Sequence, residues 1–498
     1  MNDSSDKTIF SKIDIIFALV MLVCGFLFWN LIRLPHLGAG VTLFSLIFCL
    51  CTFFYLQAAG FRQKGTSLVC LVIIVLSTLV FLLFDNTLIK VLNFIFLLVI
   101  VGYWISLSTG ITLKKEISAY MIGDFIHQFL VIPFCNFVCC FRALKALITE
   151  NKKGKSIWAG AFGILIILPI LVLVVNLLVE ADAAFAELVA NLHFSVSLDI
   201  ILQVIMGIPV ACYLYGLIYG CRYQRNTNHL TVEAADSVAS ACRLAPAVTV
   251  YSALTALNLV YIVFFLSQLT YLFSAFTNQL PELMTYAEYA RRGFFELCAV
   301  AGINLVIITV AYLLVKREKI KILRAETAVL SIFTLILIIT AVSKMMMYIN
   351  YYGLTQLRVY TTWFMIMLFL IFTVLLIRQF KKFNAAKVIV LGFIILFFGL
   401  CYSNVDGRIA AYNINRYKNG TLETLDIQAL TRLSDAAVPY MYDLYQHTQD
   451  QSLKADLKAA MEKNFGSVGS LPPHRTTFRD FNYQHYTAQN IKNMLSKP

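Results

Sequence analysis

The chain has 498 residues, of which 60% are hydrophobic and 13% are charged. Soluble globular proteins are roughly 45–50% apolar and about 25% charged, so this composition excludes an ordinary soluble globule and predicts a membrane protein. The formal net charge is +13. The basic residues, however, form short groups between apolar runs rather than one patch, so we do not expect nucleic acid as a partner.

Apolar runs of membrane-crossing length recur along the chain, and about 20 helical residues cross a bilayer core of about 30 Å. They predict an all-α transmembrane bundle of about eleven spans over residues 1–403. The first run is too long for a signal-peptide core and has no cleavage site after it, so we expect it to remain as an anchor. The predicted spans lie near 13–32, 40–60, 67–84, 88–107, 157–179, 198–220, 246–268, 293–315, 327–347, 361–378 and 385–403.

One segment inside the long loop 108–156 is apolar without reading as a clear span. Residues 118–146 carry His127, Gln128, Pro133 and Asn136 within an otherwise apolar stretch. Polar side chains and a proline are costly in a lipid-facing helix, so we expect an interfacial or re-entrant segment on the cytoplasmic side. A full crossing here would reverse the orientation of everything downstream.

Basic residues predict the orientation, because lysine and arginine collect in cytoplasmic loops. The intervening loops are acidic or nearly neutral: 180–197 holds three carboxylates and no lysine or arginine. This alternation places the N-terminus in the cytoplasm and residues 404–498 outside a plasma membrane. The basic loops are 108–156, 221–245, 316–326 and 378–387.

The polar tail, residues 404–498, predicts a small helical extracytoplasmic domain. We expect helices near 423–447, 451–464 and 477–494. In the second of these, Leu453, Leu457, Ala460 and Met461 recur at helical spacing and mark a buried face. The tail is also the surface on which a protein partner would be expected.

Several charged residues fall at one depth, near the outer ends of the later spans. Charges in the hydrocarbon cost several kcal/mol and are candidates for function. Glu288, Arg292 and Glu296 share one helical face at spacings of four residues. Snorkelling and structural ion pairs are one explanation, and an outward-facing polar vestibule is the other. The candidate vestibule residues are Asp182, Glu288, Arg291, Arg292, Glu296, Lys344 and Arg358.

Motifs for catalysis or cofactor binding are missing from the sequence. It has no phosphate-binding loop, no zinc-protease signature and no nucleophile elbow. Cys135, Cys139 and Cys140 have no histidines at zinc spacing. Lys90 lies five residues after Asp85, which predicts an ordinary interfacial ion pair. We therefore predict no catalytic residue, cofactor or metal, and we expect membrane lipid as the surrounding ligand.

Five segments carry a resemblance to a known family: Ala181–Phe185, Tyr286–Leu297, Tyr352–Arg358, Ile409–Tyr417 and Leu433–Pro439. Together they resemble the bacterial membrane proteins named domain of unknown function 4173, with its sibling 4153, over residues 150–445. The resemblance implies a multi-pass protein of a bacterial plasma membrane and implies no reaction. Lys344 departs from the arginine of the family pattern, and a lysine does not replace a bidentate arginine.

Three functional hypotheses follow from these features. A transporter or transport accessory would use the polar vestibule. The alternative is a non-enzymatic component for sensing, assembly or envelope maintenance, which would act through its tail. An intramembrane enzyme on lipid-linked substrates, with Glu296 or Asp182 as acid or base, is less favoured because no leaving-group or metal site is evident.

Overall fold

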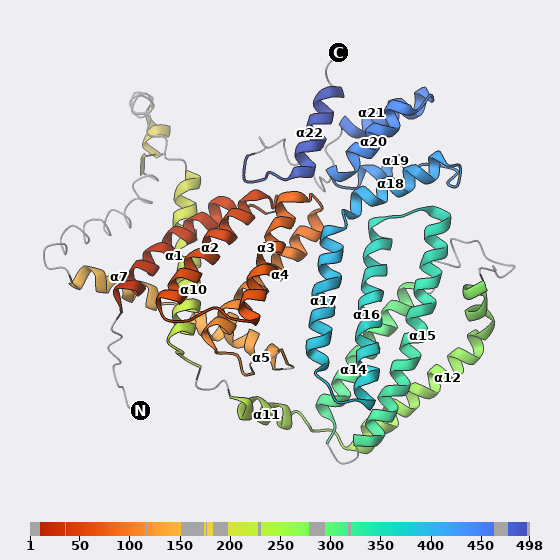
Figure 1. Ribbon diagram of the computed structural model, residues 1–498, viewed down its shortest axis with the longest axis horizontal. Helices are drawn as coiled ribbons and strands as arrows, with labels where there is room; N and C mark the ends of the chain where they lie inside the picture. Colours follow the sequence, from red (N-terminus) through yellow and green to blue (C-terminus); the bar gives the residue numbers. More distant parts are fainter. Residues whose placement is uncertain are drawn as a thin grey trace.

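The computed structural model (Figure 1) describes residues 10–150, 174–182, 198–227, 231–277, 294–316, 320–462 and 477–495, except positions 35, 115, 116, 119 and 176. Within these ranges the chain is helical and contains no β-strand. Ten helices there are long and apolar enough to cross a membrane, and a bent helix pair over 121–146 raises the number to eleven if it crosses as one span. The predicted all-α, multi-span fold is confirmed. The predicted span 157–179 lies largely outside the described residues.

The first bundle comprises the N-terminal helices and packs around a continuous apolar core. Met21, Trp104 and Tyr215 are fully buried in it. Helices α1 and α10 approach closely through glycines, since a Cβ on Gly25 would lie 2.1 Å from the carbonyl oxygen of Gly207. The elements are α1 Lys12–Leu31, α2 Ala39–Ala58, α3 Thr66–Leu83, α4 Thr87–Thr109, α5 Met121–Ile126, the π-helix η1 His127–Val131, α6 Ile132–Cys135, α7 Cys139–Glu150 and α10 Leu198–Arg222.

A buried carboxylate fixes the start of α1 to the end of α10. Ser11 caps α1 in a reciprocal capping box with Asp14. The Asp14 side chain is fully buried and accepts hydrogen bonds from Tyr55 at 2.6 Å, Arg222 at 2.7 Å and Tyr223 at 2.8 Å. The start of α1, the end of α2 and the end of α10 therefore lie at the same end of the bundle.

The second bundle is built from later helices around its own core. Leu330 and Phe372 are fully buried there. Helix α15 has 33 residues, or about 50 Å, so it extends beyond a hydrocarbon core of about 30 Å. The elements, with the connecting helix α11, are α11 Val232–Ala241, α12 Ala247–Thr277, α14 Phe294–Leu314, α15 Ile320–Tyr352, α16 Gln356–Phe380 and α17 Ala385–Tyr402.

The tail lies across the ends of α3, α16 and α17, opposite the basic loops (Figure 1). Its predicted apolar face is buried, with Leu457 and Met461 fully inaccessible. The sequence prediction missed α18, whose polar residues face the bundle, and the predicted helix 423–447 is divided near Ser434 and Pro439. The elements are α18 Val405–Lys418, α19 Ile427–Thr431, the 3-10 helix η2 Asp435–Ala437, α20 Val438–His447, α21 Gln451–Glu462 and α22 Tyr483–Leu495.

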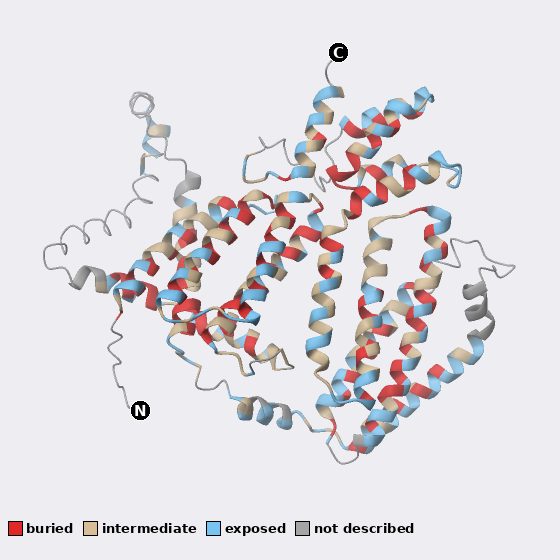
Figure 2. Cartoon of the chain, in the orientation of Figure 1, coloured by how far each residue is buried: buried red, intermediate tan, exposed pale blue. Residues whose placement is uncertain are grey.

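The outer faces of the spanning helices are apolar and exposed. Val72 on α3 is 59% exposed and Ile95 on α4 is 55% exposed. Figure 2 shows buried residues gathered inside the first bundle and the tail, while much of α12 is exposed. Exposed apolar surface on this scale is stable in lipid and not in water, so the protein is an integral membrane protein.

Candidate functional site

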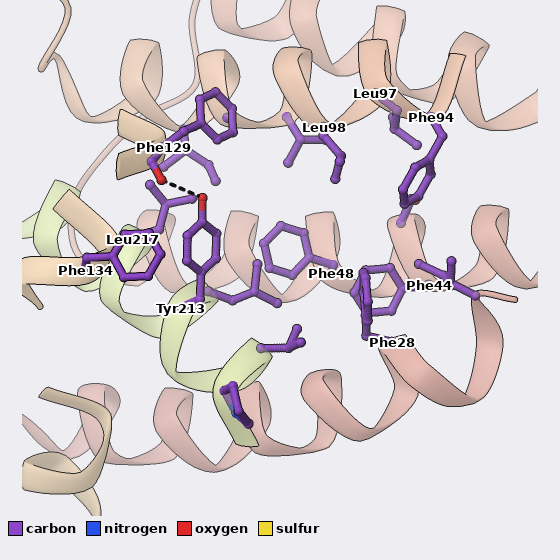
Figure 3. A pocket seen from close by; sticks show the side chains of 18 of the residues that line it. Phe28, Phe44, Phe48, Phe94, Leu97, Leu98, Phe129, Phe134, Tyr213 and Leu217 are labelled. Atoms are coloured by element: carbon purple, nitrogen blue, oxygen red, sulfur yellow. Dashed lines mark hydrogen bonds between the residues drawn. The ribbon is translucent and has the colours of Figure 1, made fainter. Parts of the chain in front are cut away.

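The first bundle encloses an apolar cavity of about 430 Å³ (Figure 3). Helices α1, α2, α4 and α10 form its walls, and the segment over η1 and α6 closes one end. Among its lining residues only Ser45 and Tyr213 have polar side chains, and none is charged. The aromatic rings that line it are Phe28, Phe44, Phe48, Phe94, Phe129, Phe134, Phe137 and Tyr213.

The cavity is elongated along the bundle. On α4 its lining runs from Phe94 to Ile105, a separation of about 16 Å at 1.5 Å per residue. One leaflet contributes about half of a hydrocarbon core that is about 30 Å thick. The cavity therefore matches the depth of a single lipid chain in one leaflet.

The π-helix η1 forms the floor of the cavity and is fixed by polar contacts. The Tyr213 hydroxyl donates to the carbonyl oxygen of Phe129 at 3.0 Å, as Figure 3 shows. Gln128 donates from Nε2 to the carbonyl oxygen of Gly102. A Cβ on Gly102 would lie 2.4 Å from the Phe129 ring, so only glycine at this position lets the ring close the cavity. Single π-turns inside helices are frequent at functional sites.

Residues 121–146 begin and bend at one end of the bundle, where α4 and α10 end. The segment follows the last residue of α4, Thr109, and its bend lies against Gly216 and Gly220 in the final turns of α10. Phe129 reaches Gly102, which is about 10 Å from the end of α4, or roughly a third of the bilayer core. These contacts support the re-entrant interpretation of a helix pair that bends by 43°.

The lining of the cavity reaches the lipid-facing surface of the bundle. Three of the lining residues are exposed: Leu98 on α4 at 48%, Phe134 on α6 at 60%, and Pro209 on α10. An apolar lining that is exposed in the hydrocarbon region is accessible to lipid chains and unfavourable for ions.

The predicted vestibule residues are only partly placed by the structure. Glu288, Arg291 and Arg292 lie outside the described residues. Asp182 is exposed at the end of a short helical stretch, and Glu296 is exposed in the first turn of α14. Neither residue lines the apolar cavity.

The remaining two candidates lie on neighbouring helices of the second bundle. Lys344 is half-buried on α15. The Arg358 guanidinium on α16 stacks over the Tyr348 ring at 4.0 Å and donates to the carbonyl oxygen of Gly353. Arg358 thus stabilises the turn between α15 and α16. A shared polar vestibule stays a prediction.

A polar site, separate from the apolar cavity, joins the tail to the bundle through Asp406 on α18. Its carboxylate is 1% exposed and accepts from Gln356 Nε2 at 2.8 Å, Asn86 Nδ2 at 2.9 Å and the Ser434 amide at 3.0 Å. These donors come from α16, the cap of α4, and the start of η2. A buried carboxylate with three donors holds these elements in register.

Beside Asp406 lies a cluster of charges in which the ligand atoms of Asp85, Asp435 and His485 are within 4.8 Å of one another. Lys90 contacts Asp85 at 3.3 Å, and Lys492 contacts Asp435 at 3.1 Å. The two ammonium groups already compensate the two carboxylates, so this cluster fits an ion-pair network better than a metal centre. The hydrogen bond from His485 Nδ1 to Asp435, at 2.5 Å, raises the pKa of His485.

Sequence reasoning missed the cavity and foresaw only part of the charge cluster. It paired Lys90 with Asp85, which the structure confirms, but it did not foresee that Lys90 is buried. Phenylalanines that face the cavity and phenylalanines that face lipid have the same helical spacing. The one local signal was Gln128 within an apolar stretch, which predicted an irregular segment.

Comparison with known proteins gives one family. The family described as Domain of unknown function (DUF4153) matches residues 70–444. No match to the chain was found among curated proteins or among solved structures. The matched region runs from α3 into α20 and includes the α4 and α10 walls of the cavity. The sequence resemblance named this family as the sibling of family 4173, and the match over three quarters of the chain shows that the protein belongs to the domain of unknown function 4153 family.

Proposed function

We propose that this multi-pass membrane protein handles lipids or lipid-linked molecules, as a transporter or transport accessory, by holding one hydrocarbon chain in the cavity of its first bundle. The observation that carries the proposal is the apolar cavity itself, whose lining is exposed at Leu98, Phe134 and Pro209. The cargo that it fits is apolar where it contacts the protein.

The size of the cavity argues that it is filled in the membrane. A space of about 430 Å³ between packed helices loses van der Waals contacts with its lining when it is empty. The cavity is partly open to the surface, so an apolar chain from the surrounding lipid can fill it and restore these contacts.

Water is a poor occupant, because apolar cavities stay dry unless polar groups hold the water. Of the two polar lining side chains, Tyr213 already donates to Phe129. A lipid chain needs no hydrogen bonds and has direct access from the bilayer. It also gains little hydrophobic free energy on leaving one apolar medium for another. A lipid chain that is held mainly by the shape of the cavity can exchange with chains of the bilayer. A protein that transfers lipid requires such exchange.

The basic loops support an orientation for this proposal. Lysines and arginines follow the ends of α4, α10, α14 and α16, so we infer that this end faces the cytoplasm and that the tail is extracytoplasmic. The family resemblance supports a bacterial plasma membrane. The re-entrant floor then lies in the cytoplasmic leaflet.

An assembly or sensing function through the tail is the second candidate. The Asp406 contacts connect the tail directly to Asn86, the cap of α4. Helix α4 continues from this cap into the cavity wall. A partner bound to the tail would therefore act on the same helix that lines the cavity.

The test maps the residues that contact a lipid chain in the reconstituted protein. A photoactivatable phospholipid with a diazirine on its acyl chain is incorporated into proteoliposomes, and adducts are mapped by mass spectrometry. We expect adducts on peptides of α4 and α10 that line the cavity. Ser45→Phe, which projects a ring into the cavity from α2, should strongly reduce them, and Val210→Phe should do so from the opposite wall.

The matched control is Val72→Phe, which adds similar bulk at a lipid-facing position that is 59% exposed. It should leave cavity adducts unchanged. Equal labelling of the cavity peptides in all three variants, each monodisperse and folded, would refute a lipid chain in the cavity. The proposal would also be refuted if no cavity peptide of the wild-type protein were labelled.

A further inference from the structure

Four exposed aromatic residues gather at the start of the last helix. Phe478 is 63% exposed, Phe481 40%, Tyr483 60% and Tyr486 53%. The rings of Phe481 and Tyr486 are 6.0 Å apart, and the Arg479 guanidinium lies 5.8 Å from the Phe478 ring. We call these four residues the aromatic patch. Soluble surfaces seldom expose so many large rings together without a partner.

Main-chain hydrogen bonds place the aromatic patch at the level where spans end. The amide of Ala39 donates to the carbonyl oxygen of Phe481 at 2.9 Å, and the amide of Gly40 donates to that of Arg479 at 2.8 Å. Ala39 and Gly40 are the first residues of α2. A Cβ on Gly38 would lie 2.5 Å from the backbone of Asp480, so the segment rests directly on the helix end.

The two sides of α22 differ in burial. Asn482 and Ala488 are buried toward the tail and bundle, and Asn482 donates to Asp85 at 2.9 Å. Tyr483, Tyr486 and Met494 are exposed on the other side. Trp29, near the outer end of α1, is exposed as well. Phenylalanine, tyrosine and arginine at such a level are typical of the headgroup region of a bilayer.

We propose that the aromatic patch contacts the headgroup region of the same membrane that holds the spans. The patch would anchor the start of α22 to the lipid surface, while Asn482 anchors it to the bundle. The patch contacts lipid rather than a protein partner, because the main-chain hydrogen bonds fix it to the first residues of α2, where this span meets the surface of the bilayer. This inference does not depend on the cavity.

The test places a benzophenone amino acid at Phe478, Tyr483 or Tyr486 in the full chain, reconstituted into phosphatidylglycerol–phosphatidylethanolamine vesicles. After irradiation, lipid adducts are counted by mass spectrometry. Ile95, which is 55% exposed on α4, is the positive control. Lys458, exposed on α21, is the negative control, since α21 packs on α19, α20 and α22 of the tail.

We expect adduct yields at the patch close to that at Ile95 and well above that at Lys458. Yields at the background level of Lys458, with Ile95 labelled normally, would overturn the proposal. Crosslinks from the patch to a second copy of the chain would also overturn it, in favour of a protein interface. Three separate positions keep the test decisive if one substitution impairs folding.

Discussion

Replacing Asp14 by alanine should destabilise the first bundle more than removing any exposed ion pair of the protein. Asp14 is fully buried, and the Arg222 side chain with which it pairs is 12% exposed. Alanine removes the carboxylate and leaves the guanidinium uncompensated, along with the hydroxyls of Tyr55 and Tyr223. The effect should therefore spread to α2 and α10, although the substitution lies in α1.

The magnitude follows from burial. Breaking a buried pair by removing one partner costs about 3–5 kcal/mol, because an unpaired charge stays behind. The matched control is Asp443→Ala, which breaks a tail pair with Lys418 of similar length, 2.7 Å. Its side chains are 55% and 35% exposed, and exposed pairs contribute roughly 0–1 kcal/mol. The Asp14 substitution should thus have several times the effect of its control.

The protein contains its own reporters of unfolding. Cys24, Cys140, Cys212 and Cys221 are buried thiols of the first bundle, so a maleimide dye that fluoresces on reaction follows its thermal unfolding in mild detergent. Equal melting temperatures for the Asp14 and Asp443 variants would refute the reasoning. The double variant with Arg222→Ala should cost less than the sum of the single variants by about 1 kcal/mol or more, because no charge is then left unpaired.

Two further predictions concern the tail and its contact with the turn between α15 and α16. Asp435 raises the pKa of His485, so protonated His485 stabilises the fold fully below the unfolded pKa of about 6.5, and this contribution is lost as the pH rises through the native pKa. The melting-temperature difference between wild type and His485→Gln should therefore shrink with rising pH, and a difference that does not depend on pH would contradict this. Gly353 has φ +77°, and a Cβ there would lie 2.5 Å from Asn413 Oδ1, so Gly353→Ala should cost about 1–3 kcal/mol. Gly420→Ala, at φ +68° in open space, controls for backbone strain alone and should cost less in the same melting assay.

The sequence predicted the membrane architecture well, for a direct physical reason. A bilayer requires about 20 apolar residues per crossing, and this requirement appears in each run independently of all the others. The ten described spans match predicted runs on this basis. The irregular segment at 118–146 was also predicted, because Gln128, Pro133 and Asn136 are costly in a lipid-facing helix.

The tail shows where such reasoning becomes incomplete. The buried face of α21 was predicted from helical spacing, but α18 was missed because its buried residues include Asp406 and Asn413. A polar residue is predicted to face water unless its partners are known. The partners of Asp406 are Asn86 and Gln356, which are distant in sequence.

What the sequence alone determined is therefore the set of membrane-spanning helices that the structure describes, the grouping of basic residues into alternate loops and the start of a polar tail. Only the tertiary structure decided which aromatic rings enclose a cavity and which face lipid, because both kinds are apolar and share one helical period. It also decided the partner of each buried charge, including Asp14 with Arg222. Lipid-facing positions and cavity-lining positions both carry apolar side chains, so only the packing of the helices distinguishes one kind of position from the other.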